Sequence, residues 1–260
     1  MPKLSEKLLA AGFPTPAPNS RIAHALRRTG VPKTPELSRI LALPRRKLII
    51  EGDKVIEEKP DGTRTEIPDL TPIFRKPGGT LKLRPLQNAA LWNAYHANGG
   101  FFPIGVGGGK TLVALLLPEA MNSKKTVLLV KPELRRQLLE KDVPFYRKHF
   151  NLPLDRIFVV AYSELSSARK ADILDRIQPD CIVSDEAHSI RVKSSTRTRR
   201  FLRYMRNHPE CRFVPLSGTM SKRSITEYAH LIELALRKNS PLPNNYQDLE
   251  SWSEAIDIEE

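Results

Sequence analysis

Short apolar runs alternate with longer segments of helical spacing from residue 81 onward, and this alternation restricts the fold most. The runs are FFPI (101–104), TVLLV (126–130), IFVVA (157–161), CIVS (181–184) and RFVPL (212–216), and the predicted helices lie near 110–121, 133–149, 164–177, 196–207 and 222–238. The runs contain little alternation of apolar and polar residues, which is typical of parallel strands covered by helices on both faces. The order predicts an α/β fold with a mainly parallel sheet flanked by helices.

The first 80 residues differ in composition from the rest. They hold eleven of the 22 prolines, which disfavour long helices. Within this region KLIIEG and KVIEEK, followed by a Pro-Asp-Gly turn and TRTEI, predict a small β-meander, because β-branched runs flank turn residues. We expect an N-terminal accessory region and linker over 1–80, a main domain over 81–240, and a tail or connecting segment over 241–260.

A glycine-rich segment follows the first apolar run and precedes the helical stretch LVALLL. Its residues are Gly105, Val106, Gly107, Gly108, Gly109, Lys110 and Thr111. A strand before and a helix after are the context of a phosphate-binding loop, in which glycines let backbone N–H groups approach the phosphates. Lys110 is expected to reach the β- and γ-phosphates, and the Thr111 hydroxyl to bind Mg²⁺. The strict motif would need glycine at Ile104, so the match is to a relaxed form; the alternative is a flexible glycine turn.

An acidic segment, Asp185-Glu186-Ala187-His188, directly follows CIVS. The carboxyl ends of parallel strands form the ligand edge of an α/β sheet, so both acids are expected there. Asp185 would hold Mg²⁺, directly or through water, and Glu186 would orient and deprotonate the attacking water. The alternative is a solvated acidic box at the start of a helix. We expect the glycine-rich and acidic segments to meet around one magnesium nucleotide, with Lys110, Asp185 and Glu186 as catalytic residues.

Taken in order, these motifs resemble those of superfamily 2 helicases and translocases, with the closest likeness to the Swi/Snf branch. The segment Leu83-Arg84-Pro85-Leu86-Gln87 looks like the adenine-reading segment of that family, so the resemblance implies nucleotide contacts by Arg84 and by Gln87, which would pair with the base. Ser217, Gly218 and Thr219 resemble the motif that couples hydrolysis to domain movement, and His188 would link the acidic segment to the γ-phosphate. The likeness covers residues 81–240 and implies a RecA-like P-loop NTPase domain, the first of two motor domains.

Basic residues gather directly after the acidic segment. They are Arg191, Lys193, Arg197, Arg199, Arg200, Arg203 and Arg206, with no acid among them. Such a density can neutralise several phosphates, although a solvated helix face is the alternative, and the interspersed Phe201, Leu202 and Met205 indicate that part of the segment packs inward. The family likeness adds Lys131, Arg135 and Tyr162 to Arg191, Lys193 and Arg197 as candidate nucleic-acid contacts. No feature indicates base reading, so binding is expected to be independent of sequence.

Composition supports a polyanionic partner in a reducing compartment. The formal charge is +13, which favours a polyanion such as DNA, RNA or an acidic protein, although solubility alone is the alternative. Among nucleic acids, DNA is preferred over RNA. Only Cys181 and Cys211 occur, without a paired-cysteine motif, so neither a disulfide framework nor a zinc site is indicated. No apolar run reaches the roughly 18 residues of a membrane span, and the N-terminal apolar stretch is too short for a secretory signal. We expect a cytoplasmic protein, or one of the host cytoplasm if viral, without a membrane partner.

The sequence therefore predicts an ATPase motor domain of a helicase or translocase, with ATP and Mg²⁺ as cofactors. A complete family member has a second RecA-like domain that supplies arginines to the γ-phosphate, whereas this chain continues for about forty residues after Thr219. Such an arginine is worth roughly 10³ to 10⁵ in rate, so full activity is expected to need a second motor-domain polypeptide or a larger complex. One alternative is a module that binds ATP and nucleic acid without hydrolysis. Another is an unrelated P-loop kinase or GTPase, which would not explain Gln87.

Overall fold

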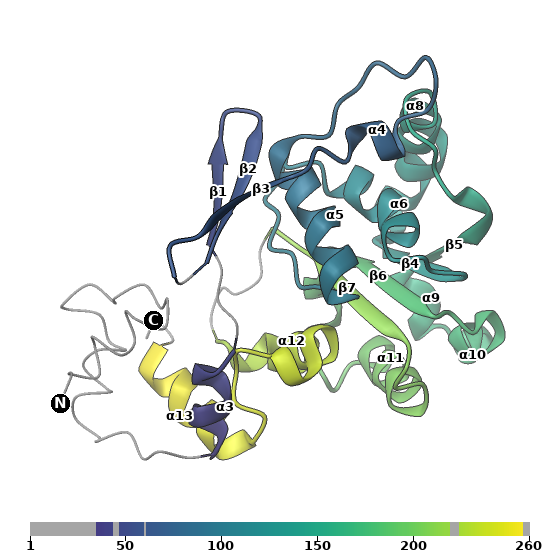
Figure 1. Cartoon of the computed structure of the whole chain (residues 1–260). Helices are drawn as coiled ribbons and strands as arrows, with labels where there is room; N and C mark the ends of the chain where they lie inside the picture. Colours follow the sequence, from purple (N-terminus) through teal and green to yellow (C-terminus); the bar gives the residue numbers. More distant parts are fainter. Residues whose placement is uncertain (1–34, 44–46, 60, 219–223, 257–260) are drawn as a thin grey trace. The chain divides into compact units, whose positions relative to one another are not determined.

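The computed structural model describes residues 35–43, 47–59, 61–218 and 224–256 (Figure 1). They divide into two compact units. The first holds the described residues of Met1–Glu66, Ser221–Glu233 and Arg237–Glu260, and the second those of Ile67–Met220 and Leu234–Leu236. The domain boundaries expected after residues 80 and 240 stay a prediction. Among the described residues, no helix has the length and apolar character to cross a bilayer.

The first unit contains the small sheet expected near the N-terminus. Its elements are α3 (Pro35–Leu41), β1 (Lys47–Glu51), β2 (Lys54–Glu58), β3 (Arg64–Ile67), η5 (Arg237–Asn239) and α13 (Tyr246–Ile256), with α12 (Thr226–Leu236) as far as Glu233. The strands lie in the order β1-β2-β3, and β1 pairs antiparallel with β2 from Lys47↔Glu58 to Glu51↔Lys54. Gly52 supplies a left-handed φ of 61° at the tight turn between them. The predicted β-meander is confirmed.

Arg39 joins the two ends of the chain within this first unit. Its guanidinium donates to the carbonyl oxygens of Lys238 (3.0 Å), Ser240 (2.8 Å) and Leu242 (2.8 Å). It also pairs with Glu36 at 2.8 Å, and this ion pair holds the pKa of Glu36 below its ordinary value. Glu36 in turn accepts from the Asn244 N–H at 2.6 Å. Helix α3 is therefore fixed to η5 and the residues that follow it, about two hundred residues later.

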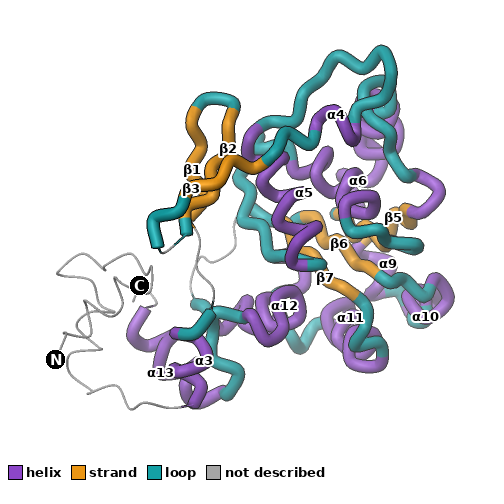
Figure 2. Tube along the Cα trace, in the orientation of Figure 1, coloured by secondary structure: helices purple, strands orange, loops and turns teal. Residues whose placement is uncertain are grey.

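The second unit is an α/β domain with a four-stranded parallel sheet in the order β5-β4-β6-β7 (Figures 1 and 2). Its elements are α4 (Thr71–Phe74), α5 (Pro85–Ala97), α6 (Lys110–Ala120), β4 (Thr126–Val130), α7 (Pro132–Gln137), η1 (Leu138–Asp142), α8 (Val143–Tyr146), η2 (Leu154–Arg156), β5 (Ile157–Ala161), α9 (Tyr162–Ser166), η3 (Ala168–Lys170), α10 (Ile173–Ile177), β6 (Cys181–Asp185), η4 (Ala187–Ile190), α11 (Thr196–Asn207) and β7 (Arg212–Leu216). The predicted α/β class, with a mainly parallel sheet flanked by helices, is confirmed.

Helices cover both faces of this sheet, which explains the continuous apolar runs. On one face the core joins Leu128, Val183 and Val214 with the buried side chains of α5 and α6. On the other face α11 packs against β7, where the rings of Phe201 and Phe213 lie 4.8 Å apart between centroids. All five residues of β4 are buried. Parallel strands buried on both sides have no solvent-facing positions, so polar residues cannot alternate along them.

The first apolar run, FFPI, does not form a fifth strand, and this prediction was wrong. Only Phe102 pairs with the sheet: its N–H donates to the Pro215 carbonyl (3.0 Å), and its carbonyl accepts from the Ser217 N–H (3.3 Å). The next residue, Pro103, has no N–H to donate to a ladder. The single bridge nevertheless places the start of the glycine-rich segment beside the carboxyl end of β7.

Two predicted helices are interrupted. The helix expected over 133–149 contains the π-helical turn η1 between α7 and α8. Pro144 has no N–H to donate to the carbonyl four residues earlier, so a regular α-helix would lose that hydrogen bond. The wider π-helical turn of η1 accommodates the proline at this place. The helix expected over 164–177 breaks at Ser167, whose backbone is extended with ψ 129°. Short elements therefore replace the long helices on this side of the sheet.

Asp180 ties together the amino ends of three strands, at the edge opposite the acidic segment. Its carboxylate accepts from the Ser123 hydroxyl (2.5 Å), from the N–H groups of Lys124 and Lys125 (3.0 Å each) and from Arg212 (3.2 Å). Burial alone would raise the pKa of Asp180, but these hydrogen bonds and the Arg212 charge outweigh it and hold the pKa below its ordinary value. The Asp180 network therefore joins the segments leading into β4, β6 and β7.

Candidate functional site

The glycine-rich segment forms a tight turn that leads directly into α6, with Gly109 as the N-cap residue. Gly107 and Gly109 have left-handed φ values of 79° and 77°, which glycine adopts without the strain of a side chain. A Cβ on Gly108 would lie 2.5 Å from Cγ2 of Ile104, which is 2% exposed, and a Cβ on Gly109 would lie 2.1 Å from Nε2 of Gln87. The packing of the turn therefore requires glycine at positions 108 and 109.

Arg84 and Gln87 hold the backbone of this turn from the start of α5. The side chain of Gln87, 4% exposed, accepts from the Arg84 N–H (2.8 Å) and donates to the Gly109 carbonyl (3.2 Å). The Arg84 guanidinium donates to the Gly107 carbonyl at 2.6 Å. Both residues that the sequence assigned to nucleotide contact therefore lie against the glycine-rich segment, and both polar ends of Gln87 already bind backbone groups.

Lys110 connects the glycine-rich segment to the acidic segment. Its ammonium lies 3.3 Å from Oε1 of Glu186, with 11% of the Lys110 side chain and 19% of the Glu186 side chain exposed. The same ammonium donates to the carbonyl oxygen of Ile104 at 3.2 Å. Two segments that are distant in the sequence therefore meet at the carboxyl edge of the sheet, as their positions after apolar runs predicted.

Glu186 lies at the centre of the acidic segment. It has a left-handed φ of 57°, so the chain turns sharply between the end of β6 and η4. Its Oε2 lies 3.2 Å from Nδ1 of His188 and accepts a long hydrogen bond from the Ser217 hydroxyl (3.5 Å). Burial and the charge of Lys131 lower the pKa of His188, so its imidazole is mainly neutral at pH 7.

The predicted coupling residues approach the site from the end of β7. Ser217 is fully buried, and a Cβ on Gly218 would lie 3.1 Å from the Cα of Gly105, so this segment packs closely against the start of the glycine-rich turn. Thr219 lies outside the described residues. The three described coupling residues therefore lie at the site. His188 and Ser217 contact Glu186 of the acidic segment, and Gly218 packs against Gly105 of the glycine-rich segment.

Asp185 has the surroundings of a cation ligand. Its Oδ1 is buried and has no hydrogen-bond partner among the described residues. Burial, and next the charge of Glu186, raise the pKa of Asp185 to about 6, against the opposing charge of Lys110. In the part of the chain that the structure describes, no group of three His, Cys, Asp or Glu side chains could form a metal cage. Carboxylate and hydroxyl oxygens suit Mg²⁺, which commonly takes its other ligands from phosphate and water, so Asp185, with Thr111 at the start of α6, remains the predicted Mg²⁺ ligand.

Tyr162 does not lie on the surface, so its side chain cannot make the predicted nucleic-acid contact in this structure. It is 1% exposed, and its hydroxyl lies 2.6 Å from the Ser184 hydroxyl and 2.7 Å from the Asp185 carbonyl oxygen. Ser184 was not among the predicted site residues. The position of Tyr162 directly after the apolar run IFVVA places it at the same edge as the acidic segment, but it does not determine whether the side chain turns inward.

The basic residues divide into two groups. Arg200 donates to the carbonyl oxygens of Leu165 (2.9 Å) and Ser167 (2.5 Å), and Arg203 contacts Ala171 and Asp175. These two arginines fasten α11 to the short elements beside it. The predicted contacts Lys131, Arg191 and Arg197 are partly exposed, Lys193 is exposed, and Arg135 pairs with Glu164 at 3.2 Å while 43% of its side chain stays exposed.

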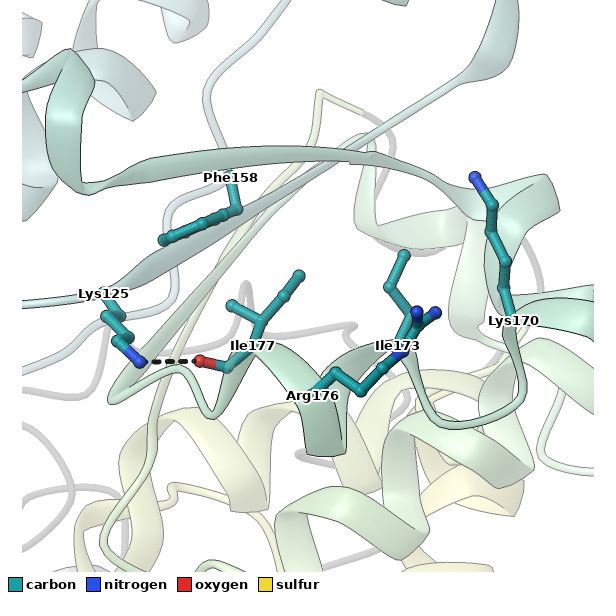
Figure 3. Close-up of a pocket in the computed structure, with 6 residues that line it drawn as sticks. All are labelled: Lys125, Phe158, Lys170, Ile173, Arg176 and Ile177. Carbon is teal, nitrogen blue, oxygen red and sulfur yellow. Dashed lines mark hydrogen bonds between the residues drawn. The ribbon is translucent and has the colours of Figure 1, made fainter.

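A separate open hollow of about 430 Å³ lies beside β5, the outermost strand of the sheet at that side, and α10 (Figure 3). It is lined by Lys125, Phe158, Lys170, Ile173, Arg176 and Ile177. Its cations are already engaged, since Lys125 binds the Ile177 carbonyl (3.3 Å), Lys170 pairs with Glu164 and Arg176 with Asp172. The hollow shares no residue with the contacts of Lys110 and Glu186, so it is not part of the candidate site.

Comparison with known proteins adds a likeness to solved structures. No protein-family model matches the chain, and no curated protein matches it. Among solved structures, the chain is similar to the SWI2/SNF2 ATPase core of Sulfolobus solfataricus, which was solved in complex with dsDNA, with a TM-score of 0.42 and 15% sequence identity. The similarity covers 67% of this chain, which spans only 39% of that protein.

Proposed function

We propose that this chain binds ATP with Mg²⁺ and hydrolyses it, as the first motor domain of a nucleic-acid translocase that resembles superfamily 2. One observation carries the proposal. The ammonium of Lys110, at the end of a glycine turn, lies 3.3 Å from the carboxylate of Glu186, at the end of a parallel strand. A cation at the start of a helix, opposite partly buried acids, is an arrangement that suits phosphoryl transfer from a nucleotide.

The residues of the chain have distinct roles in this proposal. Backbone N–H groups of Gly107 to Gly109 and the amino end of α6 would bind the phosphates. A phosphate oxygen would compete with Glu186 for the ammonium of Lys110, and the released carboxylate of Glu186 would then orient and deprotonate the attacking water. Asp185 and Thr111 would hold Mg²⁺, which neutralises charge on the phosphates when bound.

The polymer is proposed to be DNA, bound through its phosphates. The formal charge of +13 supports a polyanionic partner. Lys131, Arg191, Lys193 and Arg197 keep exposed surface near the carboxyl edge of the sheet or just beyond it, where a backbone could be bound without base reading.

A second candidate is a module that binds ATP and nucleic acid without hydrolysis on its own. The engagement of Glu186 favours it, since Lys110 contacts one carboxylate oxygen, and His188 and Ser217 contact the other. On this candidate, a second motor-domain polypeptide supplies the arginine that completes the site, as the family likeness implies.

Phosphate release by purified wild-type protein, Lys110→Ala and Glu186→Gln tests the enzymatic proposal. Lys110→Ala should weaken ATP binding and abolish hydrolysis, whereas Glu186→Gln should still bind ATP while its rate falls by about 10² to 10⁴, the usual contribution of a general base. Lys124→Ala, which removes an exposed lysine away from the site, is the control for loss of charge. Unchanged rates in both site variants would refute the enzymatic proposal.

Double-stranded DNA, single-stranded DNA and RNA, each added to the same assay, distinguish the two candidates. The translocase proposal expects stimulation, greatest with DNA. ATP binding without any hydrolysis, whichever polymer is present, would favour the module instead, and addition of a polypeptide with the second motor domain should then restore turnover.

A further inference from the structure

The hydroxyl of Tyr162 makes two buried hydrogen bonds at the end of β6. It lies 2.7 Å from the Asp185 carbonyl oxygen and 2.6 Å from the Ser184 hydroxyl. A carbonyl oxygen can only accept, so Tyr162 donates its single proton to Asp185 and accepts from Ser184. Burial raises the pKa of Tyr162 far above its ordinary value, so the phenol remains a donor throughout the working pH range.

The position of Tyr162 is fixed by the turn that begins α9. Glu164 accepts from the Ala161 N–H at 2.8 Å, which closes the first turn around Tyr162. The same carboxylate pairs with Arg135 and with Lys170. Burial alone would raise the pKa of Glu164, but the bonds to Lys170 and Ala161 and the Arg135 charge outweigh it, so the pKa lies below its ordinary value and Glu164 stays ionised. Tyr162 therefore presents its hydroxyl from a rigid support.

The bond from Tyr162 acts on the peptide group that joins Asp185 to Glu186. The next residue, Glu186, has a left-handed φ of 57°, a conformation that a residue with a side chain holds only when its surroundings impose it. Oδ1 of Asp185 has no hydrogen-bond partner among the described residues. Rotation of this one peptide group would therefore move both carboxylates of the acidic segment.

We infer that Tyr162 is a positioning residue that, through the Asp185 carbonyl, aims the Asp185 carboxylate at the magnesium nucleotide. The inference rests on the proposed function, because it assigns Asp185 to the metal. It also replaces the surface role that the sequence predicted for Tyr162. The residue acts from behind the acidic segment and touches neither nucleotide nor polymer.

Tyr162→Phe tests this inference, because it keeps the buried ring and removes only the hydroxyl. The probe is ATP with a methylanthraniloyl group on its ribose, whose fluorescence reports binding as MgCl₂ is titrated, and again in EDTA. Loss of a group that orients a metal ligand typically costs 10- to 100-fold in metal affinity. The Mg²⁺ concentration for half-maximal binding should therefore rise about tenfold or more, while nucleotide affinity in EDTA stays within about twofold of wild type.

Tyr204→Phe is the matched control. Tyr204 is 2% exposed, and its hydroxyl donates to the Pro179 carbonyl at 3.0 Å, just before the same strand β6 begins. Its loss removes one buried tyrosine hydrogen bond to a backbone carbonyl at the far end of the strand. Thermal unfolding should show comparable destabilisation in both variants, but Tyr204→Phe should leave the Mg²⁺ requirement unchanged. Ser184→Ala, which keeps the bond from Tyr162 to Asp185, should have less than about a threefold effect.

The outcomes separate the inference from the function on which it rests. An unchanged Mg²⁺ requirement in Tyr162→Phe, or an equal rise in Tyr204→Phe, overturns the positioning role while nucleotide binding by the wild type stands. A wild-type protein that binds no nucleotide in MgCl₂ removes the proposed function, and the inference with it. A selective rise in Tyr162→Phe supports both.

Discussion

Gly109→Ala should destabilise the protein more than Gly107→Ala, although both glycines have nearly the same backbone conformation. Their φ values are 77° and 79°. Around Gly107 a Cβ would meet no atom within 4 Å, whereas at Gly109 it would lie 2.1 Å from Nε2 of Gln87. The pair therefore separates the strain of a left-handed alanine, which both variants share, from the steric conflict, which only Gly109→Ala has.

The magnitudes follow from these contacts. A left-handed conformation costs a residue with a Cβ about 1–2 kcal/mol, which is the expected effect of Gly107→Ala. In Gly109→Ala, Gln87 must also move, and it then loses its bonds to the Gly109 carbonyl and the Arg84 N–H, at about 1 kcal/mol each. Gly109→Ala should therefore cost about 3–4 kcal/mol in total.

Urea unfolding followed by circular dichroism measures the difference. With a slope of about 2 kcal/mol per molar urea, the two variants should have midpoints about 1 M apart, with Gly109→Ala the lower. Gln87→Ala in the Gly109→Ala background removes the clashing side chain. The double variant should therefore lose less stability than the sum of the losses in the two single variants. Equal midpoints for Gly107→Ala and Gly109→Ala would refute the proposed packing of Gln87 against the turn.

Two further predictions concern Asp180 and the arginines of α11. Because the folded pKa of Asp180 lies below its ordinary value, its stabilising effect should be complete above that ordinary value and lost as the pH falls through the folded pKa. Asp180→Asn should lower the free energy of unfolding by about 1–2 kcal/mol at pH 7 and flatten this acid limb in urea titrations. Arg197→Ala should reduce the slope of log affinity against log salt for duplex DNA by about 0.9, measured by fluorescence anisotropy. Arg200→Ala loses hydrogen bonds to two carbonyl oxygens, so it should lower the urea midpoint and leave that slope unchanged. A DNA affinity that does not depend on salt would contradict the phosphate contacts, and an unchanged midpoint for Asp180→Asn would contradict the network at the strand ends.

The sequence predicted the layers of the fold well, because burial on both faces determines the composition of a parallel strand. Four of the five apolar runs are strands of the sheet. The remaining run, FFPI, has the same apolar character but only one residue paired with the sheet, since Pro103 has no N–H to continue the strand pairing. An apolar run predicts that its residues are buried. It does not predict that the backbone pairs with a strand, because pairing depends on partners that lie elsewhere in the sequence.

The candidate site was predictable where chemistry depends on backbone position, and less so where it depends on side-chain direction. The positions of Lys110 and Glu186 after apolar runs placed both at one edge, and the structure brings them together. The direction of Tyr162 was missed, because a tyrosine that follows a strand can turn outward to solvent or inward to a polar partner. Its partners are Ser184 and a backbone carbonyl, and neither has a sequence signature.

The contact of Arg39 with Lys238, Ser240 and Leu242 also constrains the order of folding during synthesis. Helix α3 leaves the ribosome about 10–40 s before its carbonyl partners, at the usual rate of 5–20 residues per second. All strands of the parallel sheet leave the ribosome within that interval, since β4 begins at Thr126 and β7 ends at Leu216. The strands of the parallel sheet can therefore pair first, and the contacts of Arg39 in the other unit close only when Leu242 has left the ribosome.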